Sequence, residues 1–315
     1  MKAMILSKAG NVNNLKIAEI PQPAIKPDEV LIKVKAISIN PVDVKARAYE
    51  GVLEWIYKEE KEIILGWDIS GEVVEIGHEV NSFQVGDEVF GMVNFFGNGK
   101  AYAQYVTSPQ NHLALKPEGI SHEEAAGISM VGSTAYQALV EIAKIKKGDK
   151  VLIHAASGGV GHIAVQLAKY FGAYVMGTSS AKNREFVLSL GADEHIDYTT
   201  GNLVSAVKDI DIVIDTIQGQ ALSDSMEVMR PGGTIVTLPT PEIPEEIKSR
   251  AEERHVNIEF MMVESKKETI LALAQLLSQG VVKTHIHKKF AFEDMRNAHL
   301  EVETGRVRGK VIVVI

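Results

Sequence analysis

Short apolar runs, separated by proline and glycine, fill the first third of this 315-residue chain. The runs are rich in valine, isoleucine and tyrosine and only a few residues long, which is typical of strands in a compact β-barrel or sandwich. We predict strands at residues 2–7, 30–39, 69–76, 88–93 and 102–107. Residues 55–62 mix charged and aromatic side chains, and this pattern favours neither a helix nor a strand.

The pattern changes after Pro117. Ser121 and Glu124 have the spacing of a capping box, and an alanine-rich helix is predicted to follow. From Lys150 onward, apolar runs of strand length alternate with helical segments. We predict strands at residues 151–154, 174–176, 210–214, 234–238 and 256–261, and helices at 160–171 and 183–190. This alternation predicts an α/β fold with a doubly wound, parallel Rossmann sheet, because parallel strands are joined by right-handed crossovers.

The C-terminal segment returns to a mixed pattern, with helices predicted at 269–278 and 292–303 and strands at 285–289 and 307–315. We expect it to pack on the N-terminal β-domain, which makes the Rossmann region an insertion. The predicted domains are residues 1–118 with 264–315, and residues 119–263. The strand at 256–261 is apolar and is expected at a sheet edge, where pairing with a second copy would form a two-fold homodimer.

Composition narrows the classes of protein and partner. With 41 acidic and 33 basic residues the net charge is −8, which disfavours nucleic acid and anionic membranes as partners. The chain has no cysteine, which excludes disulfides, catalytic thiols and zinc sites that use sulfur. Residues 1–20 lack the apolar run of a signal peptide, and no stretch reaches the roughly 20 apolar residues of a membrane helix. We therefore expect a cytoplasmic protein.

A turn of small residues, AASGGVG over residues 155–161, joins a predicted strand to a predicted helix. In a dinucleotide-binding turn three positions are normally glycine, and here they are Ala156, Gly158 and Gly161. The helix N-terminus offers unpaired N–H groups and a partial positive charge to phosphate. The alternative is an ordinary tight turn between strand and helix. The residues expected to contact the dinucleotide are Ser157, Gly158, Gly159, Val160 and Gly161.

The segment that follows the next predicted strand favours NADPH as the cofactor. About twenty residues after the first glycine position, NAD-binding proteins carry an Asp or Glu that binds the ribose hydroxyls. Residues 177–184 read GTSSAKNR, and no carboxylate occurs before Glu185. Hydroxyls and cations would hold a 2′-phosphate, and a carboxylate would repel it. The expected anchors are Thr178, Ser179, Ser180 and Lys182; the alternative is a polar helix cap with solvated charges.

Several separated motifs accompany the glycine turn. They are NPVD at 40–43, GWDISG at 66–71, VGDEV at 85–89, GSTAY at 132–136 and GK at 309–310. Together they resemble the medium-chain dehydrogenase/reductase superfamily, and within it the zinc-free quinone oxidoreductase and enone reductase branch. The resemblance covers nearly the whole chain. It implies a mainly β, GroES-like substrate and catalytic domain in addition to the Rossmann domain.

The resemblance also locates the positions at which related alcohol dehydrogenases hold a catalytic zinc ion. In this chain they carry Asn40, the pair Trp67-Asp68, and Met130. Asn is a poor zinc ligand, Trp cannot ligate, and Met is too soft, so Asp68 alone cannot hold a metal. We expect no metal site, and without its Lewis acid simple alcohol dehydrogenation becomes unfavourable.

The resemblance also implies roles for individual residues. Asn40 and Thr134 would lie beside the nicotinamide, and Asp43 would order the surrounding hydrogen bonds; these three are the catalytic candidates. Thr134 and Lys310 would also contact the cofactor, and Tyr198 would lie beside its adenine ribose. From the residues alone, simpler roles stay open: Asn40 as a helix cap, Asp43 as a first-turn charge, Tyr198 as an exposed aromatic. Candidates for an aromatic pocket wall are Tyr49, Trp55, Tyr57, Trp67, Phe95 and Phe96.

These features predict a zinc-independent, NADPH-dependent oxidoreductase that transfers hydride to small quinones or α,β-unsaturated carbonyls. In such acceptors the developing negative charge spreads onto an oxygen, which hydrogen bonds can stabilise without a metal. Two alternatives stay open: an NADPH-binding sensor or scaffold protein with little turnover, and a reductase of enoyl thioesters.

Overall fold

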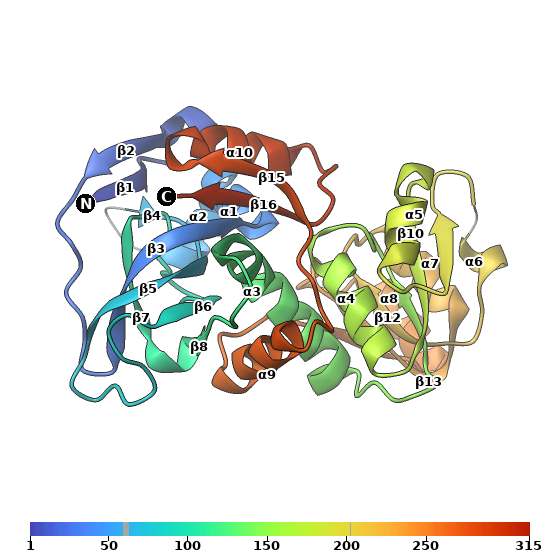
Figure 1. Ribbon diagram of the computed structural model, residues 1–315. Coiled ribbons are helices and arrows are strands. Elements are labelled where there is room, and N and C mark those ends of the chain that lie inside the picture. Colours follow the sequence, from blue (N-terminus) through green and yellow to red (C-terminus); the bar gives the residue numbers. More distant parts are fainter. Residues whose placement is uncertain (59–62, 202) are drawn as a thin grey trace. The chain divides into compact units, whose positions relative to one another are not determined.

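The chain divides into two compact units in the computed structural model, which describes residues 1–58, 63–201 and 203–315 (Figure 1). Met1–Ser133 with Val263–Ile315 form one unit, here called the split unit, and Thr134–Met262 form the Rossmann unit. The domain boundaries predicted after residues 118 and 263 stay predictions. Of the unassigned segment 55–62, residues 59–62 lie outside the described residues, and residues 55–57 belong to helix α2 (Glu50–Tyr57).

Parallel strands form the sheet of the Rossmann unit, in the order β11-β10-β9-β12-β13-β14 over the described residues. Numbered along the chain, this is the order 3-2-1-4-5-6 of a doubly wound dinucleotide-binding sheet. The predicted Rossmann sheet is therefore confirmed, and β14 lies at its edge as expected. The strands are β9 (Lys150–Ile153), β10 (Tyr174–Ser179), β11 (Glu194–Asp197), β12 (Ile210–Asp215), β13 (Met229–Thr237) and β14 (Asn257–Phe260).

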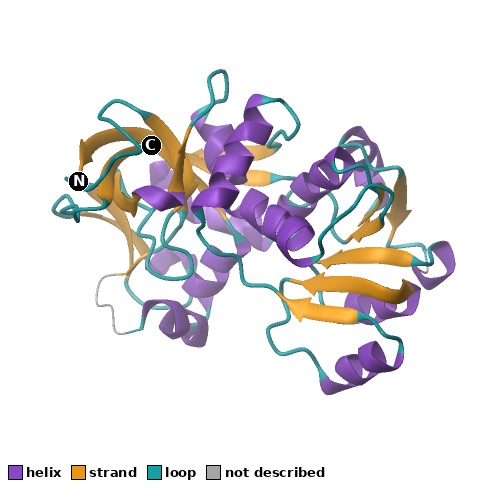
Figure 2. Ribbon diagram, turned by 90° about the horizontal axis from the view of Figure 1, so that it is seen from below, coloured by secondary structure: helices purple, strands orange, loops and turns teal. Residues whose placement is uncertain are grey.

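The central strands of this sheet are continuous apolar runs, and they are buried. Val151, Leu152 and Ile153 of β9 are all fully buried, as a parallel strand covered on both faces requires. Helices lie on both faces of the sheet (Figure 2). Helix α4 packs on β9 and β10, and α7 packs on β12 and β13. The helices of this unit are α4 (Gly159–Tyr170), α5 (Arg184–Ser189), α6 (Leu203–Ala206), α7 (Gln220–Val228) and α8 (Glu245–Glu253).

The split unit is built on two sheets. The larger follows the path β15-β16-β3-β5-β6-β8, with β7 also paired to β3, and the smaller is β2-β1-β4. The long strand β3 (Glu29–Ile39) is buried over most of its length and forms the centre of the larger sheet. The other strands are β1 (Lys2–Leu6), β2 (Leu15–Glu19), β4 (Ile63–Ile64), β5 (Asp68–Ile76), β6 (Glu88–Met92), β7 (Tyr105–Pro109), β8 (Leu113–Leu115), β15 (Ile286–Ala291) and β16 (Lys310–Val314).

The C-terminal strand packs on the N-terminal part of the chain, as the sequence predicts. Strand β16 pairs antiparallel with β3, and Val311 lies opposite Ile39. Gly309, just before β16, has a φ of +70°, and a Cβ there would lie 2.1 Å from the carbonyl oxygen of His285. Only glycine allows this close approach in this conformation, and it sets Lys310 at the start of the strand.

Helices also belong to the split unit. Ser121 and Glu124 form the predicted capping box: the Ser121 N–H donates to the Glu124 carboxylate at 3.0 Å, and the Glu124 N–H donates to the Ser121 hydroxyl at 3.2 Å. The helix predicted at 292–303 begins as a 3-10 turn, Phe292–Asp294, before it becomes α10. Besides α2, the helices are α1 (Pro41–Ala48), α3 (His122–Tyr136), α9 (Lys267–Ser278) and α10 (Met295–Glu303).

In the part of the chain that the structure describes, four strands are not predicted from the sequence pattern: β2, β4, β8 and β11. Strands β2 and β11 lie at sheet edges, where one buried face suffices, and only one residue of each is buried. Strand β11 reads EHID, and among its residues only Ile196 is buried. Strands β4 and β8 have two and three residues, too few to display a period of two.

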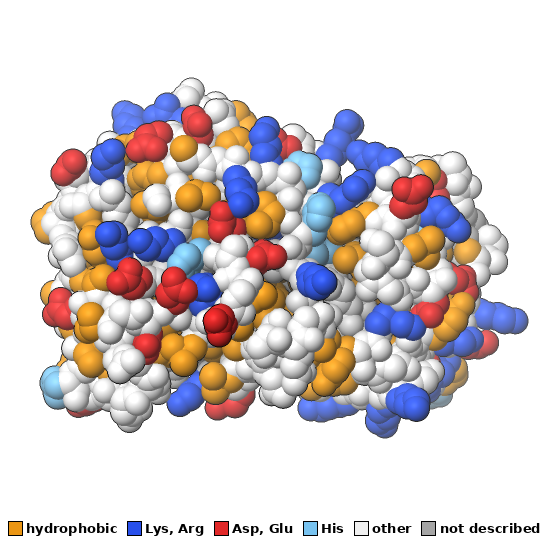
Figure 3. Space-filling model, viewed as in Figure 1, with side chains coloured by type: hydrophobic (Ala, Val, Ile, Leu, Met, Phe, Trp, Pro, Cys, Tyr) orange, Lys and Arg blue, Asp and Glu red, His pale blue; other side chains and the backbone are white. Residues whose placement is uncertain are grey.

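Acidic and basic side chains are interspersed on the face of the split unit seen in Figure 3. Several form exposed pairs, such as Lys288 with Glu301 at 3.1 Å and Lys289 with Glu123 at 2.6 Å. Such pairs are typical of a solvated surface and contribute little to stability. Among the described residues, no helix combines the length and the apolar character needed to span a lipid bilayer.

Candidate functional site

The turn between β9 and α4 is shaped by close backbone packing. Ala155 has a φ of +46°, and its carbonyl accepts the Gly158 N–H at 2.8 Å. Gly158 is the N-cap of α4. A Cβ at Gly161 would lie 2.3 Å from the Ala155 carbonyl oxygen and 2.7 Å from the Cα of Ala156. The helix can begin this close to the strand only because residue 161 is glycine.

Backbone N–H groups gather at the first turn of α4. The first helical bond runs from the His162 N–H to the Gly158 carbonyl at 3.0 Å. The N–H groups of residues 159–161 precede it and have no partner inside the helix. Ser157, beside them, accepts a hydrogen bond from the Asn183 side-chain amide at 3.0 Å. With the helix dipole, this arrangement suits the pyrophosphate of a dinucleotide.

The end of strand β10 gathers hydroxyl and aromatic groups. The Ser179 Oγ lies 2.8 Å from Nε2 of His195 on the neighbouring strand β11. Tyr198 follows β11, its N–H donates to the Ser179 carbonyl at 3.3 Å, and its side chain is 66% exposed. Ser180 is half-buried and caps the 3-10 turn that carries the exposed Lys182. The predicted anchors Ser179, Ser180 and Lys182 thus lie at one strand end, where Tyr198 also lies.

Charged groups of both signs lie near this strand end. Burial lowers the pKa of His195, and the charge of Arg184 lowers it further, whereas Asp197 raises it. The Asp197 carboxylate accepts hydrogen bonds from the Thr199 N–H at 2.9 Å and from its hydroxyl at 2.8 Å. These hydrogen bonds lower the pKa of Asp197 and keep it ionised, so an anion at this strand end would depend on the hydroxyls and cations to offset that charge.

Thr178 lies on the opposite face of the strand from Ser179, because successive strand residues alternate in direction. Its Oγ1 is 3.1 Å from Nδ1 of the buried His154, and the His154 Nε2 is 2.8 Å from the Ser225 hydroxyl. Burial lowers the pKa of His154 and favours its neutral form. Thr178 therefore belongs to an internal network with His154 and Ser225, on the face of β10 opposite Ser179.

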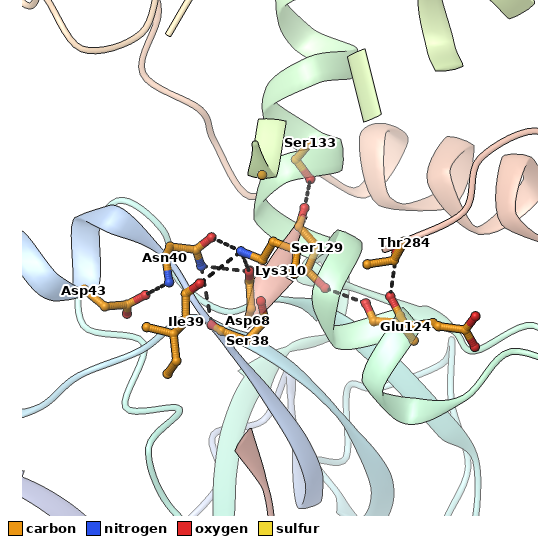
Figure 4. A network of polar contacts seen from close by, with 12 residues as sticks. Ser38, Ile39, Asn40, Asp43, Asp68, Glu124, Ser129, Ser133, Thr284 and Lys310 are labelled. Atoms are coloured by element: carbon orange, nitrogen blue, oxygen red, sulfur yellow. Dashed lines mark hydrogen bonds and ion pairs between the residues drawn. The ribbon is translucent and has the colours of Figure 1, made fainter. Parts of the chain in front are cut away.

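In the split unit, side chains from separate elements meet in a second, fully buried network (Figure 4). Asn40 is the N-cap of α1, and its N–H donates to the Asp43 carboxyl at 2.6 Å. Its side-chain amide donates to the Asp68 carboxyl at 2.8 Å. The Lys310 ammonium donates to the Asn40 Oδ1 and to the Ile39 carbonyl, the latter at 3.2 Å. The same ammonium lies 3.9 Å from the Asp68 carboxyl.

Burial controls protonation in this network. It raises the pKa of Asp43 to about 8 and that of Asp68 to about 7. The Lys310 charge opposes the rise at Asp68, as does the hydrogen bond from Asn40. Burial also lowers the pKa of Lys310, against the pull of the two carboxylates. Because two carboxyl groups share one cation, we infer that Asp43 holds a proton near neutral pH.

Tyr102 and His299 extend the network toward helix α10. The Tyr102 hydroxyl lies 3.0 Å from the His299 Nε2, and it also contributes a hydrogen bond to Asp43. Burial lowers the pKa of His299 to about 3, so its imidazole is neutral. Sequence reasoning missed both residues, as it missed His195 and Asn183. His195 and Asn183 lie in polar segments that give no local signal, and all four residues approach their partners only through the fold.

The aromatic candidates largely form one cluster in the split unit. Ring centroids are 4.3 Å apart for Trp55 and Phe96, 5.5 Å for Phe95 and Phe96, and 5.1 Å for Trp67 and Phe95. Tyr57 continues it, 6.2 Å from Trp67. Trp67 is fully buried, whereas Trp55 is 56% and Phe96 36% exposed. The cluster thus runs from the core to an exposed aromatic pair. Tyr49, between α1 and α2, is exposed and has no ring contact among the described residues.

The predicted catalytic residues occupy different settings. Asn40 and Asp43 meet directly, and both simpler roles also apply, since Asn40 caps α1 and Asp43 lies in its first turn. Thr134 is buried in the last turn of α3. The Asp68 carboxyl receives the Asn40 amide, a bond that the zinc-ligand comparison alone did not suggest.

Trp67 and Met130 stand at positions that match the zinc ligands of related alcohol dehydrogenases. The Trp67 indole N–H donates to the Gly97 carbonyl at 2.7 Å. The Met130 backbone N–H lowers the pKa of Asp68, so the position of Met130 does adjoin Asp68. In the described part of the chain, no group of three or more His, Cys, Asp or Glu side chains could hold a metal ion.

A doubly wound sheet with a glycine turn defines a dinucleotide-binding protein. Comparison with known proteins sharpens this. The family model "Alcohol dehydrogenase GroES-like domain" matches residues 26–118, and "Zinc-binding dehydrogenase" matches residues 190–313.

Two curated relatives and one solved structure are similar along nearly the whole chain. A "2-methylene-furan-3-one reductase" of Solanum lycopersicum is 34% identical, over 99% of this chain and 79% of the relative. An Arabidopsis thaliana "NADPH-dependent alkenal/one oxidoreductase, chloroplastic" is 33% identical, with the same coverage. The quinone oxidoreductase structure from Coxiella burnetii is 35% identical with a TM-score of 0.93, over 100% of this chain and 99% of that one.

The chain belongs to the medium-chain dehydrogenase/reductase superfamily, in its quinone oxidoreductase and enone reductase branch. It is an NAD(P)H-type oxidoreductase.

Proposed function

We propose that this protein is a zinc-independent reductase that uses NADPH to reduce small quinones or α,β-unsaturated carbonyl compounds. The observation that carries the proposal is which groups stand at the positions matched to zinc ligands. The Asn40 Oδ1 accepts from the Lys310 ammonium, the Trp67 indole N–H donates to the Gly97 carbonyl, and residue 130 is a methionine, whose side chain offers only a thioether. These groups do not fit zinc, although one matching family model is named for zinc binding.

Without a Lewis acid, an isolated carbonyl is a poor hydride acceptor. A conjugated acceptor spreads the developing charge to an oxygen that hydrogen bonds can stabilise. The exposed Trp55–Phe96 pair supports the same substrate class, because aromatic surfaces suit planar, apolar molecules. Relatives named for reducing enones, alkenals and quinones add further support.

Preference for NADPH is supported by the strand end after β10. Ser179, Ser180 and Lys182 would hold the 2′-phosphate, and Tyr198 would lie against the adenine ribose. The turn residues 157–161 would hold the pyrophosphate. A relative whose printed name includes NADPH dependence agrees with this choice.

In the reaction, bound NADPH supplies the hydride. Asn40 and Thr134 would orient the nicotinamide, and Asp43 would hold Asn40 in place through its backbone N–H. The aromatic pair would exclude water from the acceptor. A proton would follow from water or a nearby hydroxyl.

Loss of nicotinamide absorbance with a panel of quinones and enones tests the proposal. We expect turnover with NADPH, weaker use of NADH, no effect of a chelator, and no oxidation of simple alcohols. Tight NADPH binding with no turnover would instead favour a sensor or scaffold role. Asn40→Ala should slow turnover without abolishing it; an unchanged rate would remove Asn40 from the nicotinamide site.

We also propose a cytoplasmic location and a homodimer formed through the edge strand β14. The strand has an unpaired edge among the described residues, and pairing with a second copy would cover it. Sedimentation that shows a monomer at micromolar concentration would contradict the dimer.

A further inference from the structure

Lys310 belongs to the buried network, and the proposed function gives its charge no role in the reaction. The position of this residue is set by two constraints. Gly309 brings the chain against His285, and the pairing of Val311 with Ile39 places residue 310 next to Asn40 across the β16–β3 ladder. The side chain is 2% exposed, so the ammonium is held inside the split unit.

Oxygens of the same unit surround this ammonium. It donates to the Ile39 carbonyl and to the Asn40 Oδ1, and Asp68 lies 3.9 Å away. An ammonium has three N–H donors and no acceptor; the Ile39 carbonyl and the Asn40 Oδ1 use two of them, and the Asp68 carboxyl balances the charge across an ion pair. Lys310 therefore has little capacity left for a direct bond to a nucleotide.

The Lys310 ammonium fixes the orientation of the Asn40 side-chain amide. An amide can flip and exchange its carbonyl for its NH2, and the two orientations offer opposite hydrogen bonds. A lysine can only donate, so it requires the Oδ1 on its side. The Asp68 carboxylate can only accept when ionised, and it receives the Nδ2 at 2.8 Å. Lys310 and Asp68 thus lock one orientation from both sides.

This lock decides what Asn40 can offer. One Nδ2 hydrogen is used by Asp68, and the other faces the Ser38 carbonyl at 3.5 Å. The remaining strong capacity is the second lone pair of Oδ1, an acceptor. An acceptor matches the amide N–H of a nicotinamide carboxamide.

The same groups occupy the positions that hold zinc in related alcohol dehydrogenases. Asn40 and Asp68 stand at two of the matched positions, and Met130 at the third approaches Asp68 through its backbone N–H. The positive charge among them comes from Lys310 instead of a metal. We propose that Lys310 is a built-in cation that neutralises Asp68 and locks Asn40 as a hydrogen-bond acceptor for the nicotinamide, which makes it a positioning residue. This inference rests on the proposed function.

A charge-balanced double variant tests it. Lys310→Met removes the cation, and adding Asp68→Asn removes the charge left behind. We expect the single variant to lose thermal stability and the double variant to regain much of it, because no uncompensated charge stays buried. The kcat should fall about 10- to 100-fold in both, since Asn40 is no longer locked, and the NADPH Kd should change less than about threefold. Lys288→Met, at an exposed lysine on β15, is the matched control and should change neither quantity.

A readout independent of turnover distinguishes a lock on the Asn40 amide from a role of Lys310 in charge balance alone. In the wild type the Asn40 side-chain NH2 should exchange slowly with solvent and give a distinct amide signal in a nitrogen-15 spectrum; in the double variant that signal should shift and exchange faster. A double variant with wild-type kcat would overturn the proposal, because Lys310 would then serve charge balance alone. A large loss of NADPH affinity with unchanged kcat would also overturn it, as would an unchanged Asn40 signal. If the wild type reduced no acceptor, the proposed function would fail, while the stability and amide measurements would still test the lock.

Discussion

The two candidate sites differ in how their functional groups are assembled. The proposed nucleotide site of the Rossmann unit uses a strand end, a turn and a helix N-terminus, all within residues 155–198, and there Lys182 and Tyr198 are exposed whereas Ser157 and Ser179 are buried. The network of the split unit joins Asn40, Asp68 and Lys310, which are far apart in the chain and fully buried. Backbone geometry dominates the first site and side-chain charge dominates the second. Substitutions should therefore damage them in different ways.

The largest expected effect comes from Gly161→Val in the Rossmann unit. Its Cβ would lie 2.3 Å from the Ala155 carbonyl oxygen, so the turn must open and the helix N–H groups must move. We expect NADPH affinity to fall by about 100-fold or more, measured by fluorescence titration. The control is Gly51→Ala in α2, where a Cβ meets nothing within 4 Å. Affinity retained by Gly161→Val would show that the turn does not depend on this packing.

Asp68→Asn should give the largest effect on stability. It leaves the Lys310 ammonium buried without its anionic partner, and we expect the free energy of unfolding to fall by about 3–5 kcal/mol in urea titrations. Glu123→Gln breaks an exposed pair with Lys289 and should cost about 0–1 kcal/mol. Equal losses in the two variants would mean that the buried Lys310–Asp68 pair contributes no more to stability than an exposed pair.

Ser179→Asp should change cofactor preference without unfolding the protein. A carboxylate at the end of β10 repels the 2′-phosphate and can accept from ribose hydroxyls. We expect the KM for NADPH to rise about 10- to 100-fold and the KM for NADH to fall. Ser189→Asp adds the same charge at an exposed site on α5 and should leave both values unchanged. A variant that still prefers NADPH would place the phosphate elsewhere.

The most gradual expected effect is a pH dependence of stability from Asp43. Its pKa is raised from 3.8 to about 8 in the fold, so between these values the folded state keeps a proton that the unfolded state has released. The stabilisation is fully present below pH 3.8 and is lost as the pH rises to about 8. Wild-type stability should fall across pH 5 to 8 by up to about 1.4 kcal/mol per pH unit more steeply than that of Asp43→Asn. Parallel urea series at each pH measure the two slopes; identical slopes would mean that Asp43 is ionised in the fold.

The chain order of the elements explains which features could be predicted. The Rossmann sheet follows from alternating apolar runs because each central strand must be buried on both faces. The turn at 155–161 is equally readable, since its small residues are adjacent in the sequence. Strand β11 was missed because an edge strand needs only Ile196 buried, and His195 was therefore missed as a neighbour of Ser179.

Resemblance supplied Asn40 and Lys310 as site residues, but it assigned Lys310 to the cofactor. The contacts of its ammonium are with Ile39, Asn40 and Asp68, which only the β16–β3 pairing brings within reach. No local pattern encodes that pairing, because residues 39 and 310 come from opposite ends of the chain.

Sequence alone thus determined the glycine-rich turn, the doubly wound sheet and the lack of cysteine ligands, all of which depend on local residue order or composition. Tertiary structure decided which charges share the buried network, which hydroxyl of β10 faces His195, and which way the Asn40 amide is held. The reason is physical: local backbone geometry follows from adjacent residues, whereas a buried charge acquires its partner only when distant strands pair and exclude water.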